Sequence, residues 1–250
     1  MNIMLTYTTI GIEKSIKDLK QIVRRDTAFA KNNVQECLKR LEGSSDILKK
    51  YQYLVYSYSS SAECYLLADG DVENFKGYCF LAAKAADILY RLYDEGYRTH
   101  NAFIRQLENR NHIRYTQYAI LANHKQLALS LAQPDTPVGC MLSGDYEKAK
   151  ALIPDQIQAA KYTSYIDEIL WTIIYGDEKK MNRLFEKRIR MLRRQARPAM
   201  PTILDSYGLA LIKLAQARNM NCNLHVRELP YDLLDHIPVD DEAWKLLADV

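Results

Sequence analysis

Two residues near the carboxyl end of the chain, Arg218 and His225, have the chemistry to act on a phosphoester. Six residues separate them, and the polar residue Asn219 follows the arginine directly. Such a pair could polarise a ribose 2′-hydroxyl and stabilise the negative charge of a phosphorane. The same residues also have a non-catalytic interpretation, in which the arginine ends a helix and its charge complements the helix dipole. At the level of the sequence both interpretations stay open.

The pair resembles the motif of the HEPN-type helical ribonucleases, in which an arginine and a polar residue precede a histidine. The resemblance implies a metal-independent ribonuclease with Arg218 and His225 as its catalytic residues. Two observations favour the non-catalytic interpretation. Arg105 and His112 have the same spacing without the asparagine, and the three asparagines that follow Arg218 at alternate positions are typical of a loop that leaves a helix.

The spacing of the histidines indicates that they do not form a metal site. His100, His112 and His124 recur at twelve-residue intervals. On a helix each interval turns the side chain by about 120°, so the three side chains point in different directions. The chain also lacks a glycine-rich phosphate loop, a zinc-binding HExxH and an EF-hand loop. We therefore expect no cofactor and no metal.

The strongest charge feature is the segment 179–197, which holds nine basic residues and one acid, Glu186. Its apolar residues recur at helical spacing, so we expect a helix that docks one face on the core and exposes a positive ridge. The ridge could bind phosphates or an acidic protein partner, or it could be neutralised within the fold. The candidate contact residues of this basic face are Arg183, Lys187, Arg190, Arg194 and Arg197.

The C-terminal stretch 228–250 has the opposite charge, with seven acids and one base, Lys245. It could lie against the basic segment, or it could present an acidic surface to a basic partner. Aromatic residues beside the acids could anchor such an interface, because buried aromatics dominate interface energetics. Alternatively, the tryptophan of this stretch packs the last helix onto the core. The candidate contact residues of this acidic face are Asp232, Asp235, Asp240, Asp241, Glu242, Tyr231 and Trp244.

The composition of the 250-residue chain predicts a globular, helical protein. Apolar residues make up 48% and charged residues 26%, which excludes wholesale disorder. Only nine glycines and seven prolines are present. Together they fall well under the roughly 12% of an average chain, so few hairpins and long helices are expected. The net charge of +3 is too small to imply general nucleic-acid binding.

Cysteine usage and hydropathy predict a cytoplasmic protein. The five cysteines are scattered and form no CxxC pair, which suggests reduced thiols. No stretch is long and apolar enough to span a membrane, and the first fifteen residues do not resemble a signal peptide. The oligomeric state does not follow from the sequence.

Helical periodicity runs through most of the chain, interrupted by turn residues. Gly70, Gly144 and Gly176 are each followed by an aspartate, so the glycine can end one helix and the aspartate can cap the next. The last two of these turns are 32 residues apart, close to the roughly 34-residue period of tetratricopeptide repeats. The expected helical blocks are 13–41, 46–68, 72–97, 100–131, 139–151, 155–175, 177–195, 202–218 and 240–248.

These elements predict an all-α fold, an irregular stack of antiparallel helices with a repeat-like, tetratricopeptide-like middle. A simpler explanation of the middle is that Gly-Asp is a good turn between helices. We expect one domain over residues 1–250, with a helical N-terminal segment, 1–45, packed on the rest.

The second half of the chain carries a recognisable order of elements. Gly144–Ala149 is followed by Leu152-Ile153-Pro154, then Ile169-Leu170-Trp171 with Gly176-Asp177; next come the helix opened by Asp205 and the segment Leu229–Leu234. This order over 90–240 resembles the all-helical immunity proteins of bacterial polymorphic-toxin and contact-dependent-inhibition systems.

The resemblance implies a cytoplasmic, non-catalytic protein that binds one cognate toxin domain and occludes its active site. It assigns no contact residues, because such proteins use different surfaces for different toxins. Two alternatives stay open: the ribonuclease described above, and a helical-repeat scaffold or regulator that binds a peptide in a groove.

Overall fold

Helices account for almost all the regular structure of the described chain. The computed structural model describes residues 7–9, 12–14, 46–69, 71–98, 113–153, 165–195, 204–224, 226 and 228–229. Within these ranges lie nine α-helices and two strands of three residues each. The all-α class predicted from the sequence is confirmed there, while the predicted helix 240–248 lies outside the described residues.

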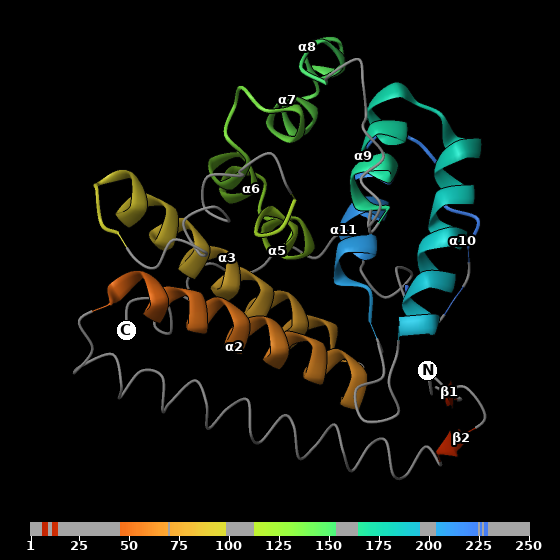
Figure 1. The fold of residues 1–250 in the computed structure, drawn as a ribbon, viewed down its shortest axis with the longest axis horizontal. Coiled ribbons are helices and arrows are strands. Elements are labelled where there is room, and N and C mark those ends of the chain that lie inside the picture. The colour runs from red at the N-terminus through yellow and green to blue at the C-terminus, as the bar shows by residue number, and fades with distance from the viewer. Residues whose placement is uncertain are drawn as a thin grey trace. The chain divides into compact units, whose positions relative to one another are not determined.

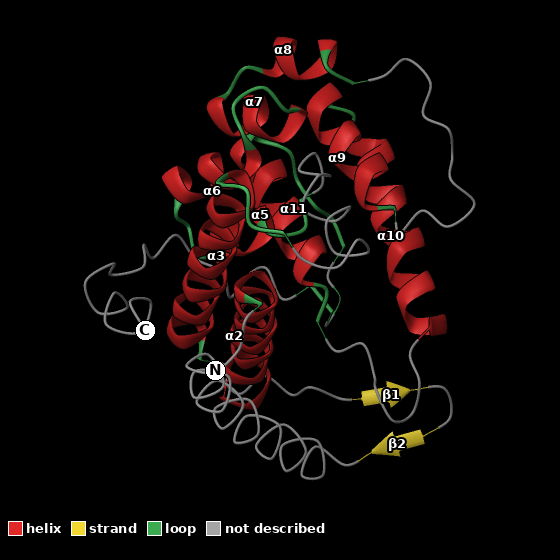
Figure 2. Cartoon of the chain, turned by 60° about the vertical axis from the view of Figure 1, so that its left-hand side comes forward, coloured by secondary structure: helices red, strands yellow, loops and turns green. Residues whose placement is uncertain are grey.

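The two strands form a short antiparallel hairpin, visible in Figure 2 as yellow arrows. Strand β1 is Tyr7–Thr9 and strand β2 is Ile12–Lys14, with Thr8 opposite Glu13. The prediction that a helix begins at residue 13 is therefore wrong at its start; the rest of that predicted helix lies outside the described residues. The aromatic and β-branched residues at 7–9 favour a strand. The prediction failed at residue 13 because it used only helical periodicity, which does not detect the pairing of two strands.

The chain divides into two compact units. Unit 1 comprises Met1–Ile16 and Pro134–Asp235, and unit 2 comprises Lys17–Gln133 and His236–Val250. The predicted single domain with its packed N-terminal segment stays a prediction, because residues 1–45 are largely outside the described chain.

Unit 2 is built on two long antiparallel helices, α2 (Ile47–Asp69) and α3 (Val72–Asp94), which lie side by side in Figure 1. The backbone N–H of Lys49 donates to Asp46 Oδ1 over 3.0 Å, so this aspartate caps α2. Asp71 caps α3 in the same way, accepting from the N–H of Asn74. The helical block predicted over 46–68 is therefore confirmed.

Two shorter helices, α5 (Thr116–Leu121) and α6 (Lys125–Ala132), pack against α3. Helix α3 carries four buried alanines, whose small side chains let neighbouring helices approach closely: Ala82, Ala83, Ala85 and Ala86. His124 is the N-cap of α6, since its Nδ1 accepts a hydrogen bond from the N–H of Leu127, and its ring contacts that of Phe80. This histidine therefore has a structural role.

The described part of unit 1 contains the hairpin and five helices. They are α7 (Pro137–Ser143), α8 (Tyr146–Ala151), α9 (Ile166–Tyr175), α10 (Glu178–Gln195) and α11 (Ser206–Ala217). Helices α9 and α10 pack side by side, as do α7 and α8 (Figure 1). The segment 139–151 predicted as one helical unit is thus two helices separated by the Gly144-Asp145 turn.

The two Gly-Asp turns of unit 1 share one geometry. Gly144 and Gly176 have φ of +85° and +76°, a left-handed conformation that ends α7 and α9. Asp145 and Asp177 then accept the N–H of the residue three positions on, each over 3.0 Å. The two turns join helices of very different lengths. The similarity between the two regions is therefore limited to the turns.

Candidate functional site

The candidate site lies on helix α10, the longest of the helices described in unit 1. Asp177 caps its first turn, the acid Glu178 lies in that turn, and Arg193 and Arg194 lie in its last turn. This distribution places negative charge at the positive end of the helix dipole and positive charge at the negative end. The local sequence therefore stabilises a helix whose middle is rich in like charges.

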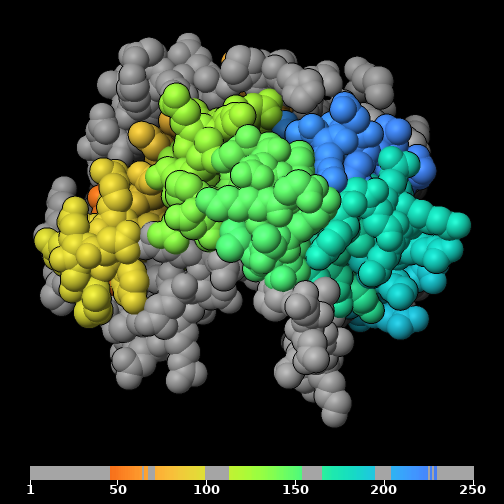
Figure 3. Space-filling view, turned by 90° about the horizontal axis from the view of Figure 1, so that it is seen from above, coloured from red at the N-terminus to blue at the C-terminus, as the bar shows by residue number. Residues whose placement is uncertain are grey.

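Apolar residues fix the orientation of α10. Met181, Phe185 and Ile189 recur at four-residue intervals and are buried. Leu184 is buried as well, and Leu192 is half-buried. The predicted apolar stripe is confirmed at these positions, and it leaves the opposite side of the helix exposed. Figure 3 shows α10, in cyan, at the surface of the molecule.

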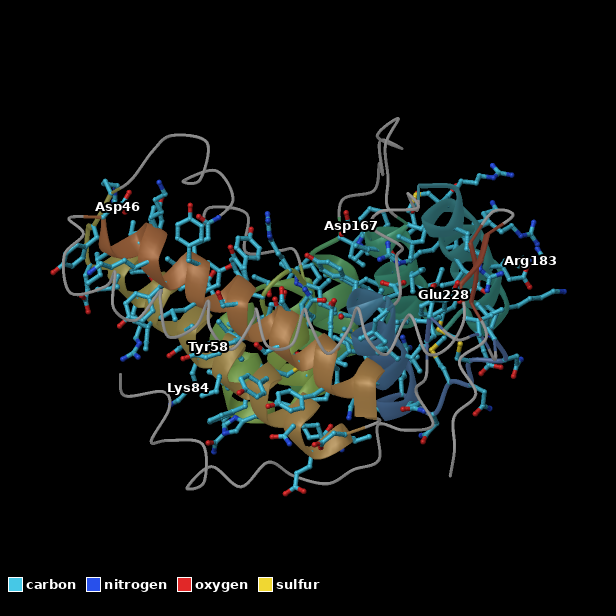
Figure 4. The ribbon with its side chains drawn as sticks, turned by 90° about the horizontal axis from the view of Figure 1, so that it is seen from below. Asp46, Tyr58, Lys84, Asp167, Arg183 and Glu228 are labelled. Carbon is cyan, nitrogen blue, oxygen red and sulfur yellow. The ribbon has the colours of Figure 1, made fainter. Side chains whose placement is uncertain are left out.

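The exposed side carries a row of cations that we call the basic stripe: Lys179, Arg183, Lys187, Arg190 and Arg194. Successive members are three or four residues apart, so they lie on one face of the helix. At a rise of about 1.5 Å per residue the stripe is roughly 22 Å long. In Figure 4, Arg183 lies at the outer edge of α10, and Glu228 lies on the inner side.

Two arginines of the basic segment are neutralised inside unit 1 and do not belong to the stripe. Arg188 is buried and forms a bidentate ion pair with Asp205, with both N–O distances 2.6 Å. Arg193 pairs with the buried Glu228 at 2.7 and 3.0 Å, and the hydrogen bond from this carboxylate raises the pKa of the guanidinium. Arg188, one of the nine basic residues of the segment 179–197, thus lies on the buried side of the helix.

Asp205 and Glu228, the residues that pair with the two arginines, are themselves joined by a backbone hydrogen bond. Asp205 caps α11 by accepting the N–H of Gly208 at 3.0 Å, and its own N–H donates to the carbonyl of Glu228 at 2.9 Å. A Cβ at Gly208 would lie only 2.5 Å from Asp205 Oδ2, so the close approach requires glycine there. Helix α10 thus pairs with Glu228, an acid of the stretch 228–250, within unit 1. From the sequence alone, such internal pairing was one of two open alternatives for the basic segment.

An open pocket of about 460 Å³ lies at the carboxyl end of the stripe. The described residues that line it are Lys187, Arg190, Arg194, Met191 and Tyr165. The last of these precedes α9 and has φ of +59°, an uncommon backbone conformation for a residue with a side chain. Arg190 also contacts Glu186, one helical turn earlier, at 3.3 Å. The described lining of the pocket therefore combines three cations with one aromatic and one thioether side chain.

Four of the five basic candidates, Arg183, Lys187, Arg190 and Arg194, lie together on the stripe, and Arg197 is outside the described residues. The candidates of the acidic face, from Tyr231 to Trp244, also lie outside the described residues. Sequence reasoning missed two pocket residues. The four-residue step from Lys187 to Met191 is a helical signal that could have identified the methionine, whereas nothing in the sequence links Tyr165 to α10.

Arg218 has structural contacts that the sequence did not reveal. It is the C-cap of α11, as the non-catalytic interpretation expects, but its guanidinium donates to the carbonyls of Ile173 and Ile174 at the end of α9. The guanidinium also lies 4.3 Å from the centre of the Tyr146 ring. These contacts hold α8, α9 and α11 together. The ribonuclease hypothesis stays a prediction, since His225 is outside the described residues.

The loop after α11 is confirmed, and α10 holds it in place. Asn219 takes φ of +57° directly after the helix. The side chain of Asn182 donates to the carbonyl of Asn221 at 3.0 Å and accepts the N–H of Asn223 at 2.8 Å. The N–H of Asn221 in turn donates to Glu178 at 2.8 Å. The inner side of α10 is thus tied to this loop by polar groups as well as by apolar packing.

Other chemical features are few in the part of the chain that the structure describes. No three metal-ligating side chains are grouped closely enough there to hold an ion. Cys79, Cys140 and Cys222 are buried cysteines outside any disulfide, and burial raises the pKa of the Cys222 thiol. None of the described helices combines the length and apolar character that a membrane span needs.

Comparison with protein-family models, with curated proteins and with solved structures finds no match to this chain.

Proposed function

We propose that the protein binds an acidic protein partner through the basic stripe and works as an immunity protein. In this proposal the partner is a toxin domain, and binding occludes its active site without catalysis. The observation that carries the proposal is the alignment of five exposed cations on one face of a helix whose opposite face is anchored in the core. The order of elements that resembles helical immunity proteins supports the choice of a toxin as the partner.

The ion pairs of α10 support a binding role for the stripe. Within the described chain no ion pair engages Arg183, Lys187 or Arg194, whereas Arg188 and Arg193 are paired with buried carboxylates. Arg188 and Arg193 therefore contribute to the stability of unit 1, while Arg183, Lys187 and Arg194 are exposed and pair with no described carboxylate. Like charges along one helix face repel one another by a few tenths of a kcal/mol per pair, and an acidic partner would relieve that repulsion.

Exposed charges of this kind act mainly on the rate of association. A positive surface steers a negative partner during diffusion, and salt weakens the attraction because the charges are exposed. The affinity itself would come from a few buried contacts near the centre of the interface. The proposal therefore predicts fast, salt-dependent binding.

The test is co-purification with the C-terminal domain of the product encoded by the neighbouring reading frame, together with protection of cells against that domain. We expect Arg183→Glu with Lys187→Glu to slow association by about tenfold or more, and to weaken its dependence on salt. The matched control is Lys49→Glu with Lys125→Glu, which changes the net charge equally on exposed positions of unit 2.

An unchanged association rate in the stripe variant, or an equal loss in both variants, would contradict the basic stripe as the contact surface. The acidic face is the other version of the same function. Its test is the joint neutralisation of Asp240, Asp241 and Glu242, which should slow association with a basic toxin and flatten the salt dependence.

A further inference from the structure

We infer that the pocket at the carboxyl end of the stripe receives an acidic peptide segment of the partner, with an apolar side chain set between its carboxylates. This inference rests on the proposed function, because it specifies what the partner presents to the same surface. The carrying observation is that three cations, Lys187, Arg190 and Arg194, surround an open pocket that also exposes Met191 and Tyr165.

The spacing of the cations sets the spacing of the carboxylates that can reach them. Lys187 and Arg190 are three residues apart, and Arg190 and Arg194 are four, so they lie about 4.5 and 6 Å apart along the helix axis. A peptide with acids separated by a few residues can place one carboxylate near each cation. The planar guanidinium of arginine can hold a carboxylate through two parallel hydrogen bonds, which fixes the direction of approach.

The two uncharged residues of the pocket, Met191 and Tyr165, are the reason for expecting an apolar side chain in the bound peptide. Met191 lies on the same face of α10 as the cations, and Tyr165, the residue before α9, lines the same pocket. A thioether adapts to the shape of an apolar group, and a tyrosine ring provides a large contact area with little loss of side-chain freedom. Such a contact excludes water from the neighbouring charges, which strengthens their attraction to carboxylates.

Nearby carboxylates favour a peptide over a nucleic acid. Glu186 lies within the exposed face and contacts Arg190, and Asp167 and Glu168 follow Tyr165 in the first turn of α9. A polynucleotide carries a charge at every step of its backbone and is repelled wherever a carboxylate interrupts the positive surface. A peptide can place an uncharged residue at those points, so Arg clusters of this kind suit an acidic motif.

The experiment measures binding of fluorescein-labelled probes to the full chain by fluorescence anisotropy. The first probe is a short peptide of aspartates and glutamates with one central leucine. The second has serine in place of the leucine, and the third is a single-stranded oligouridylate. We expect the leucine peptide to bind at least about fivefold more tightly than the serine peptide, since burying a leucine contributes over 1 kcal/mol.

Three variants separate the pocket from general attraction between opposite charges. Arg190→Gln with Arg194→Gln should weaken binding of the leucine peptide by about tenfold or more. Lys179→Gln with Arg183→Gln removes the same charge from the other end of the stripe and should weaken it by less than about threefold. Tyr165→Ala should remove the preference for leucine over serine without any change of charge. Circular dichroism checks that each variant is folded.

Equal loss from the two charge variants, equal binding of the two peptides, absence of peptide binding, or tighter binding of the oligouridylate would each overturn the inference. The last result would instead indicate a nucleic-acid surface. Failure of the proposed function has a different signature. If the pocket binds the leucine peptide as expected but reversing Arg183 and Lys187 leaves toxin protection intact, the stripe does not hold the toxin.

Discussion

Arg188 on α10 and Asp205 before α11 form a bidentate ion pair in which both side chains are almost fully buried, 5% and 2% exposed. The aspartate is also the N-cap of α11. One carboxylate therefore satisfies a buried guanidinium and the first turn of a neighbouring helix. Because Arg188 is fixed inside, the turn of α10 that carries Lys187 and Arg190 is held with its cations outward.

Removal of this carboxylate should be severely destabilising. We expect Asp205→Ala to lower the free energy of unfolding by about 3–5 kcal/mol, because it leaves the buried Arg188 charge uncompensated. Urea unfolding followed by circular dichroism measures the change. The matched control is Asp135→Ala, which removes an exposed ion pair with Lys148 and should leave the urea midpoint unchanged. Coincident midpoints for the two variants would show that the buried pair does not stabilise the fold.

The two glycines that end α7 and α9 should respond differently to alanine. Gly144→Ala should cost about 1–2 kcal/mol, because φ is positive but the space around a Cβ is open. Gly176→Ala should cost more, since its Cβ would also lie 3.2 Å from the guanidinium of Arg218. Comparing the two variants in thermal unfolding separates backbone strain from crowding. A smaller loss at Gly176 than at Gly144 would contradict the close contact.

Arg218 should act as a structural clamp. We expect Arg218→Ala to destabilise the protein by about 1.5–3 kcal/mol, because two carbonyls at the end of α9 lose a charged donor. Arg218→Lys should recover less than half of this loss, since an ammonium has no planar group to donate in the same directions while lying over the Tyr146 ring. Arg183→Ala, on the exposed stripe, is the control and should leave stability within about 0.5 kcal/mol of the unaltered chain. Full recovery by lysine would show that charge alone matters at this position.

Alkaline pH should weaken unit 2 through Tyr78. Burial, followed by the adjoining Tyr65 and Tyr58, raises the pKa of Tyr78 from 10.0 to about 12. The unfolded chain therefore ionises this tyrosine first, and the stability present below pH 10 is lost as the pH rises toward 12. Tyr78→Phe should make the fall in the free energy of unfolding across this range less steep. Tyr53→Phe, at an exposed position of α2, should not alter the slope; identical slopes for both variants would disprove the assignment.

The sequence by itself determined most of the local structure. The Gly-Asp turns at 144–145 and 176–177 and the apolar stripe of α10 were predicted from it, and the structure has them at those positions. They were predictable because each depends on helical periodicity or on a hydrogen bond between residues three positions apart. The four described members of the basic face were found for the same reason, since their spacing alone places them on one side of a helix.

Only the tertiary structure decided which charges are available and which are used by the fold. Arg188 finds its partner 17 residues away, Arg193 finds its partner 35 residues away, and Arg218 reaches a carbonyl 45 residues away. The sequence shows all three as basic residues on helices, and helical spacing cannot distinguish a buried partner from solvent. Tyr165 reaches the pocket by the same kind of long-range packing. The availability of a charge depends on desolvation and on neighbours from other elements, and these arise only when the chain folds.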